Sequence, residues 1–119
     1  MTKTLQNVVG PTATVSVIGT PTFSDASPLR ADVMTAVTDA IHLRHPGVPV
    51  VPTMQSGASD GIYFRAAGIP TYGVSGDFIK DGDDFSHGLN ERLPVKSFYE
   101  GLEYWYFLLK ELSAPKASR

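Results

Sequence analysis

The segment DDFSHGLNER, residues 83–92, concentrates side chains that could do chemistry. It carries one imidazole, His87, with Asp83 and Asp84 before it and Glu91 after it. A histidine close to carboxylates can act as a metal ligand or as a proton shuttle. The alternative is a surface loop in which the acids are hydrated and the histidine has no ligand. The residues of this segment alone leave these interpretations open.

A second candidate is the segment SGASDG, residues 56–61. It is expected to follow a strand and to precede a helix, where α/β proteins bind ligands and where free helix amides attract anions. Gly57 lets the backbone approach a ligand closely, and Ser59 adds a hydroxyl. The competing interpretation is a capping loop in which Ser59 or Asp60 is the helix N-cap.

A third candidate is the pair His42 and His45, in the sequence HLRH. This spacing near a helix end can bring two imidazoles to one metal. No acid lies between them to serve as a base, so the helix pattern of the zinc proteases is absent. A helix C-terminus also favours partial positive charge without any ligand. We favour a surface role for this pair, with independent metal binding as the alternative.

The elements that must position these residues are expected to alternate between helices and strands. Apolar spacing and turn residues predict helices at residues 2–9, 27–44, 60–68 and 96–112, and strands at residues 13–18, 48–52 and 69–74. Strands joined through helices imply parallel pairing with right-handed crossovers. The predicted fold class is therefore α/β, a partial parallel sheet with flanking helices.

Two boundaries of the predicted helices have specific signals. Ser27-Pro28 is a good helix start, and Gly68 stands where a left-handed C-cap is wanted. The last helix carries one apolar face, formed by Phe98, Leu102, Trp105, Leu109 and Leu112.

Composition excludes several classes of function. A formal net charge of -2, with scattered Lys and Arg, provides no basic surface for nucleic acid or an anionic membrane. No apolar run approaches the ~20 residues that cross a bilayer, and no signal-type stretch follows Met1, so a cytoplasmic location is expected. Cysteine is absent, so a metal would have to be held by His, Asp or Glu.

Three motifs, GASDG, GIPTYG and HGLNER, follow one another in the sequence and form a compound signal. Over about residues 27–112 the chain resembles the C-terminal end of the two-zinc aminoacylase and carboxypeptidase family. That family includes glutamate carboxypeptidase, acetylornithine deacetylase, succinyl-diaminopimelate desuccinylase and carnosinase-type dipeptidases. The stretch VSVIGTPTFSDASPLR further resembles the point where the family's inserted lid domain, which also carries dimer contacts, returns to the catalytic domain.

The resemblance implies roles for four residues. His87 would be a zinc ligand, the last of five in chain order. Gly57 and Ser59 would line the pocket for the substrate's carboxylate or amide, and Asp60 would support that loop. In the family the metal pair activates a bridging water, a glutamate takes its proton, and a peptide or N-acyl amino acid bond is hydrolysed, as two-metal chemistry allows.

The chain departs from the family pattern in its remaining ligands. It contains no H-x-D motif, and its four glutamates are unpaired and lie in the last third of the sequence. One ligand cannot hold a zinc pair. The sequence therefore predicts a C-terminal portion of a zinc-exopeptidase-like catalytic domain, inactive alone, that forms a homo-oligomer or binds a partner carrying the N-terminal half.

The resemblance also predicts the domain organisation. Residues 1–26 would be the end of a lid or dimerisation domain with its linker, residues 27–112 the catalytic portion, and residues 113–119 a frayed tail. The alternative to a hydrolase fragment is a non-enzymatic α/β interaction module that oligomerises through an exposed sheet edge.

Overall fold

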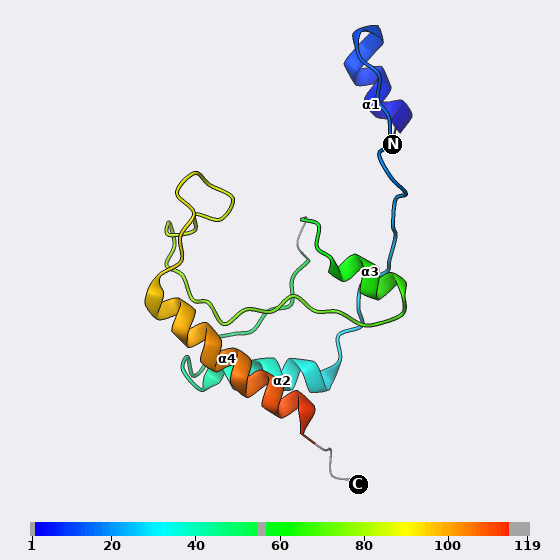
Figure 1. Ribbon diagram of the computed structural model, residues 1–119. Helices are drawn as coiled ribbons and strands as arrows, with labels where there is room; N and C mark the ends of the chain where they lie inside the picture. Colours follow the sequence, from blue (N-terminus) through cyan, green and yellow to red (C-terminus); the bar gives the residue numbers. More distant parts are fainter. Residues whose placement is uncertain (1, 55–56, 115–119) are drawn as a thin grey trace.

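The structure, a computed structural model, describes residues 2–54 and 57–114. These residues form α1 (Thr2–Val9), the 3-10 helix η1 (Gly10–Thr12), α2 (Ala31–His42), α3 (Gly61–Ala66) and α4 (Val95–Ser113). Figure 1 shows α2 and α4 crossing each other, α3 to one side, and α1 at the end of an extended arm. The described residues include no helix long and apolar enough to cross a membrane.

The predicted α/β fold is wrong for residues 2–54 and 57–114, which contain no strand and hence no parallel sheet. The three segments predicted as strands, residues 13–18, 48–52 and 69–74, are irregular. Two of the three segments nevertheless contact the core, since Val50 and Val74 pack against the buried helix residues. A strand also needs hydrogen bonds to a neighbouring strand, which apolar patterning does not supply.

The start of α2 differs from the predicted start, whereas the glycine predicted to end α3 has the expected conformation. Gly68, with a φ of 82°, adopts the left-handed conformation expected at the C-cap. The helix α2 begins at Ala31 and not at Ser27. The Ser27 hydroxyl donates to the Thr71 carbonyl oxygen and accepts the Thr71 N–H, both at 2.8 Å. Because Ser27 connects two segments that are distant in sequence, it does not cap α2.

The core is formed where α2 packs against α4. Its buried hydrophobic residues are Ala36, Val37, Ala40, Tyr104 and Leu108. The two alanines of α2 leave room for the larger side chains of α4, as close packing requires. This small cluster is the part of the described chain that excludes water.

The helix α4 has two apolar faces, and only one of them packs on α2. The packed face contains Ser97, Gly101, Tyr104 and Leu108. The face identified from periodicity is exposed, with exposed fractions from 40% for Trp105 to 59% for Leu109. Small residues at positions 97 and 101 allow neighbouring chain to approach the first face closely. The second face is left without a cover among the described residues.

The segment of residues 76–78 lies against α4 at positions that tolerate no larger residue. The aromatic ring of Tyr104 occupies the space that a Cβ at Gly76 would need. A Cβ at Gly101 would collide with the Asp77 carboxylate. The buried Ser97 hydroxyl donates to the Phe78 carbonyl oxygen at 2.8 Å. These contacts fix the end of the 69–78 segment on the helix.

Replacement of Gly76 by alanine is therefore expected to destabilise the fold by about 1 to 3 kcal/mol, the usual cost of forced overpacking. Gly73→Ala is the matched control, because a Cβ at Gly73 meets no atom within 4 Å. Urea unfolding of both variants measures the difference. Equal stability of the two variants would contradict the packing of Tyr104 on Gly76.

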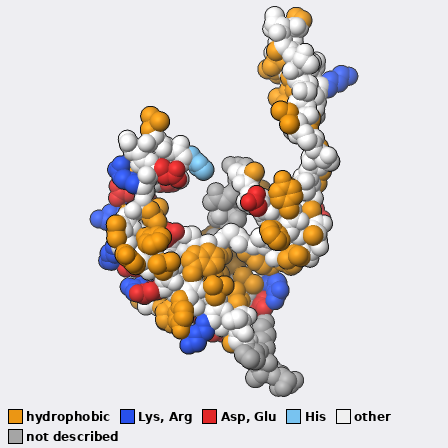
Figure 2. All heavy atoms as spheres, viewed as in Figure 1, with side chains coloured by type: hydrophobic (Ala, Val, Ile, Leu, Met, Phe, Trp, Pro, Cys, Tyr) orange, Lys and Arg blue, Asp and Glu red, His pale blue; other side chains and the backbone are white. Residues whose placement is uncertain are grey.

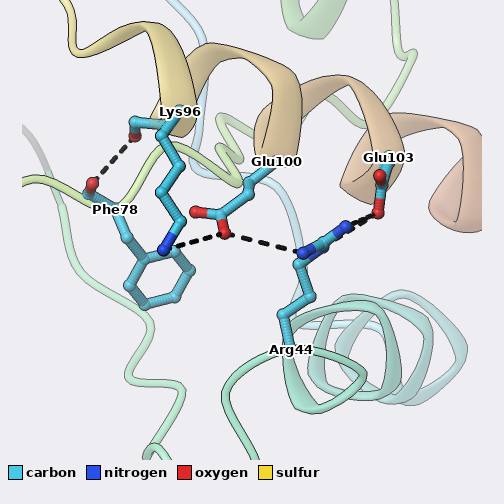
Figure 3. A network of polar contacts seen from close by, with 6 residues as sticks. Arg44, Phe78, Lys96, Glu100 and Glu103 are labelled. Carbon is cyan, nitrogen blue, oxygen red and sulfur yellow. Dashed lines mark hydrogen bonds and ion pairs between the residues drawn. The ribbon is translucent and has the colours of Figure 1, made fainter.

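An ion-pair network also joins α2 to α4, as Figure 3 shows. The Arg44 guanidinium at the end of α2 contacts the carboxylate of Glu103 and lies 3.5 Å from that of Glu100. The Lys96 ammonium lies 3.8 Å from the same Glu100 carboxylate. Because these groups are partly exposed, the network is expected to contribute little to stability.

The molecule is much more extended than a compact chain of its length. Its radius of gyration is 19.4 Å, and its principal extents are 60 × 41 × 21 Å. A compact domain of 119 residues would have a radius of gyration of about 13.5 Å. Figure 2 shows hydrophobic side chains on the surface of α4, around α3 and along the α1 arm. The described residues therefore expose apolar surface of the kind that marks interaction sites.

Burial raises the pKa of the Tyr104 phenol above its ordinary value of 10.0. The unfolded chain then loses this proton at lower pH than the folded chain does. We therefore expect the free energy of unfolding to fall as pH rises from about 10 towards the raised pKa of the folded state. Below about pH 10 this group should not make stability depend on pH. Tyr104→Phe should remove that dependence, and Tyr106→Phe, which alters an exposed tyrosine, should keep it. Urea unfolding across this pH range measures the slope, and an unchanged slope in Tyr104→Phe would refute the expectation.

Candidate metal and substrate site

His87 lies on the long loop between residues 81 and 93, where its side chain is exposed. Its φ of 59° places it in the left-handed region, the only such non-glycine residue in the described part of the chain. This conformation is uncommon for residues with a side chain and is enriched at functional sites. The turn is closed by the Gly88 N–H, which donates to the Phe85 carbonyl oxygen at 3.1 Å. The loop thus presents a single imidazole to solvent.

Asp84 supports the same turn. The Ser86 hydroxyl and the Ser86 N–H both donate to its Oδ1, at 2.5 and 3.0 Å. These two hydrogen bonds lower the pKa of the Asp84 carboxyl below its ordinary 3.8, and the bond from the Ser86 hydroxyl has the larger effect. The nearby His87 lowers the pKa further. The Asp84 carboxylate is therefore ionised at neutral pH and lies close enough to His87 to interact with it.

A contact between Phe85 and Arg92 holds the base of this loop. The Arg92 guanidinium carbon lies 3.5 Å from the centre of the Phe85 ring, a cation–π arrangement. This pair was not predicted from the sequence, where the acids and the histidine of the segment were the residues considered. An aromatic residue and an arginine on either side of HGLNE were the available signal.

Gly57, Ser59 and Asp60 are exposed and precede α3. A Cβ at Gly57 would meet no atom within 4 Å, so the backbone there is open to a ligand. Asp60 is the N-cap residue by position, but its backbone is already helical and its side chain makes no capping hydrogen bond. Asp60 therefore stands at the N-cap position, but its side chain does not cap the helix. Ser56 lies outside the described residues.

The two segments lie on the same side of the α2–α4 pair but apart from each other. Figure 1 shows the loop of residues 81–93 and the segment of residues 57–60 both projecting from that side, separated by a wide gap. The two segments therefore do not form one site among the described residues.

The pair His42 and His45 is engaged elsewhere. The His42 Nε2 is 2.9 Å from the Val48 carbonyl oxygen. The His45 ring stacks on Phe78, with ring centroids 3.8 Å apart. Each imidazole is partly buried and has its own structural contact, which favours a structural role over both the expected surface role and a shared metal.

The residues present do not fit a complete zinc site. Within residues 2–54 and 57–114, no three His, Asp or Glu side chains lie together as metal ligands. Structural and catalytic zinc sites need three or four protein ligands, and His87 is a single exposed imidazole. The described chain alone therefore supports no metal-dependent step.

Residues 5–111 match the model of peptidase family M20/M25/M40. Neither the comparison with curated proteins nor that with solved structures finds a match. The family match spans nearly the whole sequence, including the loop of His87 and the segment of Gly57 and Ser59. The chain therefore belongs to peptidase family M20/M25/M40.

Proposed function

We propose that this chain supplies one wall of a zinc-dependent site that hydrolyses peptide or N-acyl amino acid bonds. His87 contributes one imidazole ligand, Gly57 and Ser59 contact the substrate, and Asp60 supports their loop. The other metal ligands and the general base belong to polypeptide outside these 119 residues. The chain alone is catalytically inactive.

The observation that carries this proposal is an exposed imidazole in a member of a peptidase family, with no group of three metal-ligating side chains around it in the described part of the chain. The left-handed backbone at His87 and the Asp84 turn hold that imidazole outward. His87 is the third residue of the turn of residues 85–88, where a positive φ is required, so the turn fixes the direction in which the imidazole projects. The open backbone at Gly57 is consistent with a substrate passing close to the chain.

The apolar surface supports completion of the site by a second polypeptide. The exposed face of α4 and the expanded radius of gyration leave hydrophobic area for a partner to bury. The partner is either another copy of this chain or a polypeptide with the N-terminal half of the family's catalytic domain. Only the second choice brings the missing ligands.

The same exposed face of α4 favours a second candidate, a non-enzymatic interaction module. The sheet edge first expected to mediate such binding is absent from the described residues, so the apolar helix face would mediate it instead. In that case His87 has no metal to bind in any assembly.

Zinc titration by calorimetry separates the two candidates. The hydrolase proposal expects weak zinc binding by the chain alone and tight binding after addition of an N-terminal half from a family member with the H-x-D motif. His87→Ala should weaken binding in the mixture, whereas His42→Ala should not. A mixture that forms but binds zinc equally well with and without His87 favours the interaction module.

A further inference from the structure

Arg65, in the last turn of α3, is a partly buried arginine that has no acidic partner among the described residues. Its Nε–H donates to the Ser24 hydroxyl at 3.1 Å. A guanidinium has five N–H donors, so the four on the two Nη atoms are left without an acceptor in the described part of the chain. Neither Nη atom is among the polar atoms that the fold buries completely.

Two other arginines show what Arg65 lacks. Arg30 pairs with Asp32, and Arg44 pairs with Glu100 and Glu103. Both of these arginines are exposed, whereas Arg65 is partly buried. A charge that loses part of its hydration is costly unless an opposite charge compensates it. The guanidinium of Arg65 is therefore the one most favourably completed by an anion.

The free side of this guanidinium lies next to Ser59. An ideal Cβ at Gly61 would be 2.9 Å from the Arg65 Nη1 and 3.2 Å from the Ser59 Oγ. The sum of these distances, 6.1 Å, is the upper limit of the separation between the two donor atoms. Hydrogen bonds to a carboxylate span about 2.7 to 3.2 Å, so one carboxylate can accept from both donors. The missing side chain at Gly61 leaves room for the guanidinium to lie there.

We infer, resting on the proposed function in which Ser59 contacts the substrate, that Arg65 binds the substrate's carboxylate. The Arg65 Nη1 and the Ser59 hydroxyl each donate to it, and the positive charge compensates its negative charge. The substrate class is thereby narrowed to amides whose cleaved bond is followed by a free carboxylate. These are N-acyl amino acids and the C-terminal residues of peptides.

NMR titration of the full, ¹⁵N-labelled chain with N-acetylglycine and N-acetylglycinamide tests this assignment, because the two probes differ in the charged carboxylate. N-acetylglycine should shift the backbone amide signals of Ser59 and Gly61 and the Nε–H signal of Arg65. It should bind at least about 5-fold more tightly than the amide, above the range of an exposed ion pair, because the guanidinium is partly buried and forked. Equal affinity for the two probes would overturn the assignment.

Variants identify the residue responsible. Arg65→Gln keeps polar donors but removes the charge, so the preference for N-acetylglycine should disappear. Arg65→Lys keeps the charge without the fork and should retain part of it. Arg30→Gln makes the same change in net charge at a guanidinium that already has a partner, and should bind both probes as the wild type does. Circular dichroism confirms that each variant is folded. An unchanged preference in folded Arg65→Gln would overturn the assignment.

An acidic residue of a partner polypeptide is the other source of a carboxylate. In that case the wild-type chain would show no preference for N-acetylglycine, and Arg65→Gln would weaken the complex with the N-terminal half instead, which would also overturn the assignment. The NMR titration needs neither zinc nor that half. Failure of the proposed hydrolysis therefore appears in the zinc titration and leaves this result unaffected.

Discussion

Replacement of His87 by alanine is expected to abolish hydrolysis in a complex of this chain with an N-terminal half from the same family. The wild-type mixture should hydrolyse N-acyl amino acids. The His87→Ala mixture should be slower by at least about 100-fold, since loss of groups that merely support metal ligands already costs 10- to 100-fold. Initial rates at saturating zinc measure the effect.

His42→Ala is the control for this experiment, because His42 contacts the Val48 carbonyl oxygen and lies outside the proposed site. Size-exclusion chromatography must show that each variant still forms the complex. An active complex whose rate does not change on removal of His87 would remove this residue from the metal site.

Replacement of Leu108 by alanine is expected to reduce the free energy of unfolding by about 2 to 5 kcal/mol, the range for truncation of a buried leucine. Leu108 is 2% exposed and packs in the small cluster between α2 and α4. A loss of this size is a large part of the stability of a small domain, so the variant should be substantially unfolded.

The adjacent Leu109 provides a matched control, since it has the same side chain and is 59% exposed. Leu109→Ala should change stability by less than about 0.5 kcal/mol. Urea denaturation followed by circular dichroism compares the two variants. A loss at Leu109 above about 0.5 kcal/mol would show that the exposed apolar face of α4 also packs in solution, as it would if a partner covered that face.

The helices could be predicted from the sequence because their signals are local. The end of α3 follows from Gly68, and α4 follows from the apolar residues that recur at helical spacing after Pro94. The sequence did not show which face of α4 is buried, because residues of both faces recur at helical spacing. The choice depends on Gly101 and on what packs against it, which is a property of the tertiary structure.

The prediction of a sheet was wrong for a different physical reason. Residues 48–52 and 69–74 have the composition of buried strands, but a strand forms only with a neighbour to pair with. Ser27 illustrates the same limit on a smaller scale, because its hydroxyl bonds to Thr71 rather than to the helix that follows it. Contacts between residues far apart in sequence decided both cases.

The candidate site was only partly accessible to sequence reasoning. His87, Gly57 and Ser59 were selected from motifs in order, and the structure leaves all three exposed. The left-handed conformation of His87 and the Phe85–Arg92 contact were not foreseen. The guanidinium of Arg65 beside Ser59 was not foreseen either, because the sequence does not show which arginines find a carboxylate partner.

The most direct test is turnover of N-acetylated amino acids by the purified, monomeric chain saturated with zinc. A site that requires ligands from other polypeptide predicts a rate equal to that of zinc in buffer. Hydrolysis by the monomer at about 1 s⁻¹ or faster, within the ordinary range of enzymes and lost on removal of zinc, would contradict it.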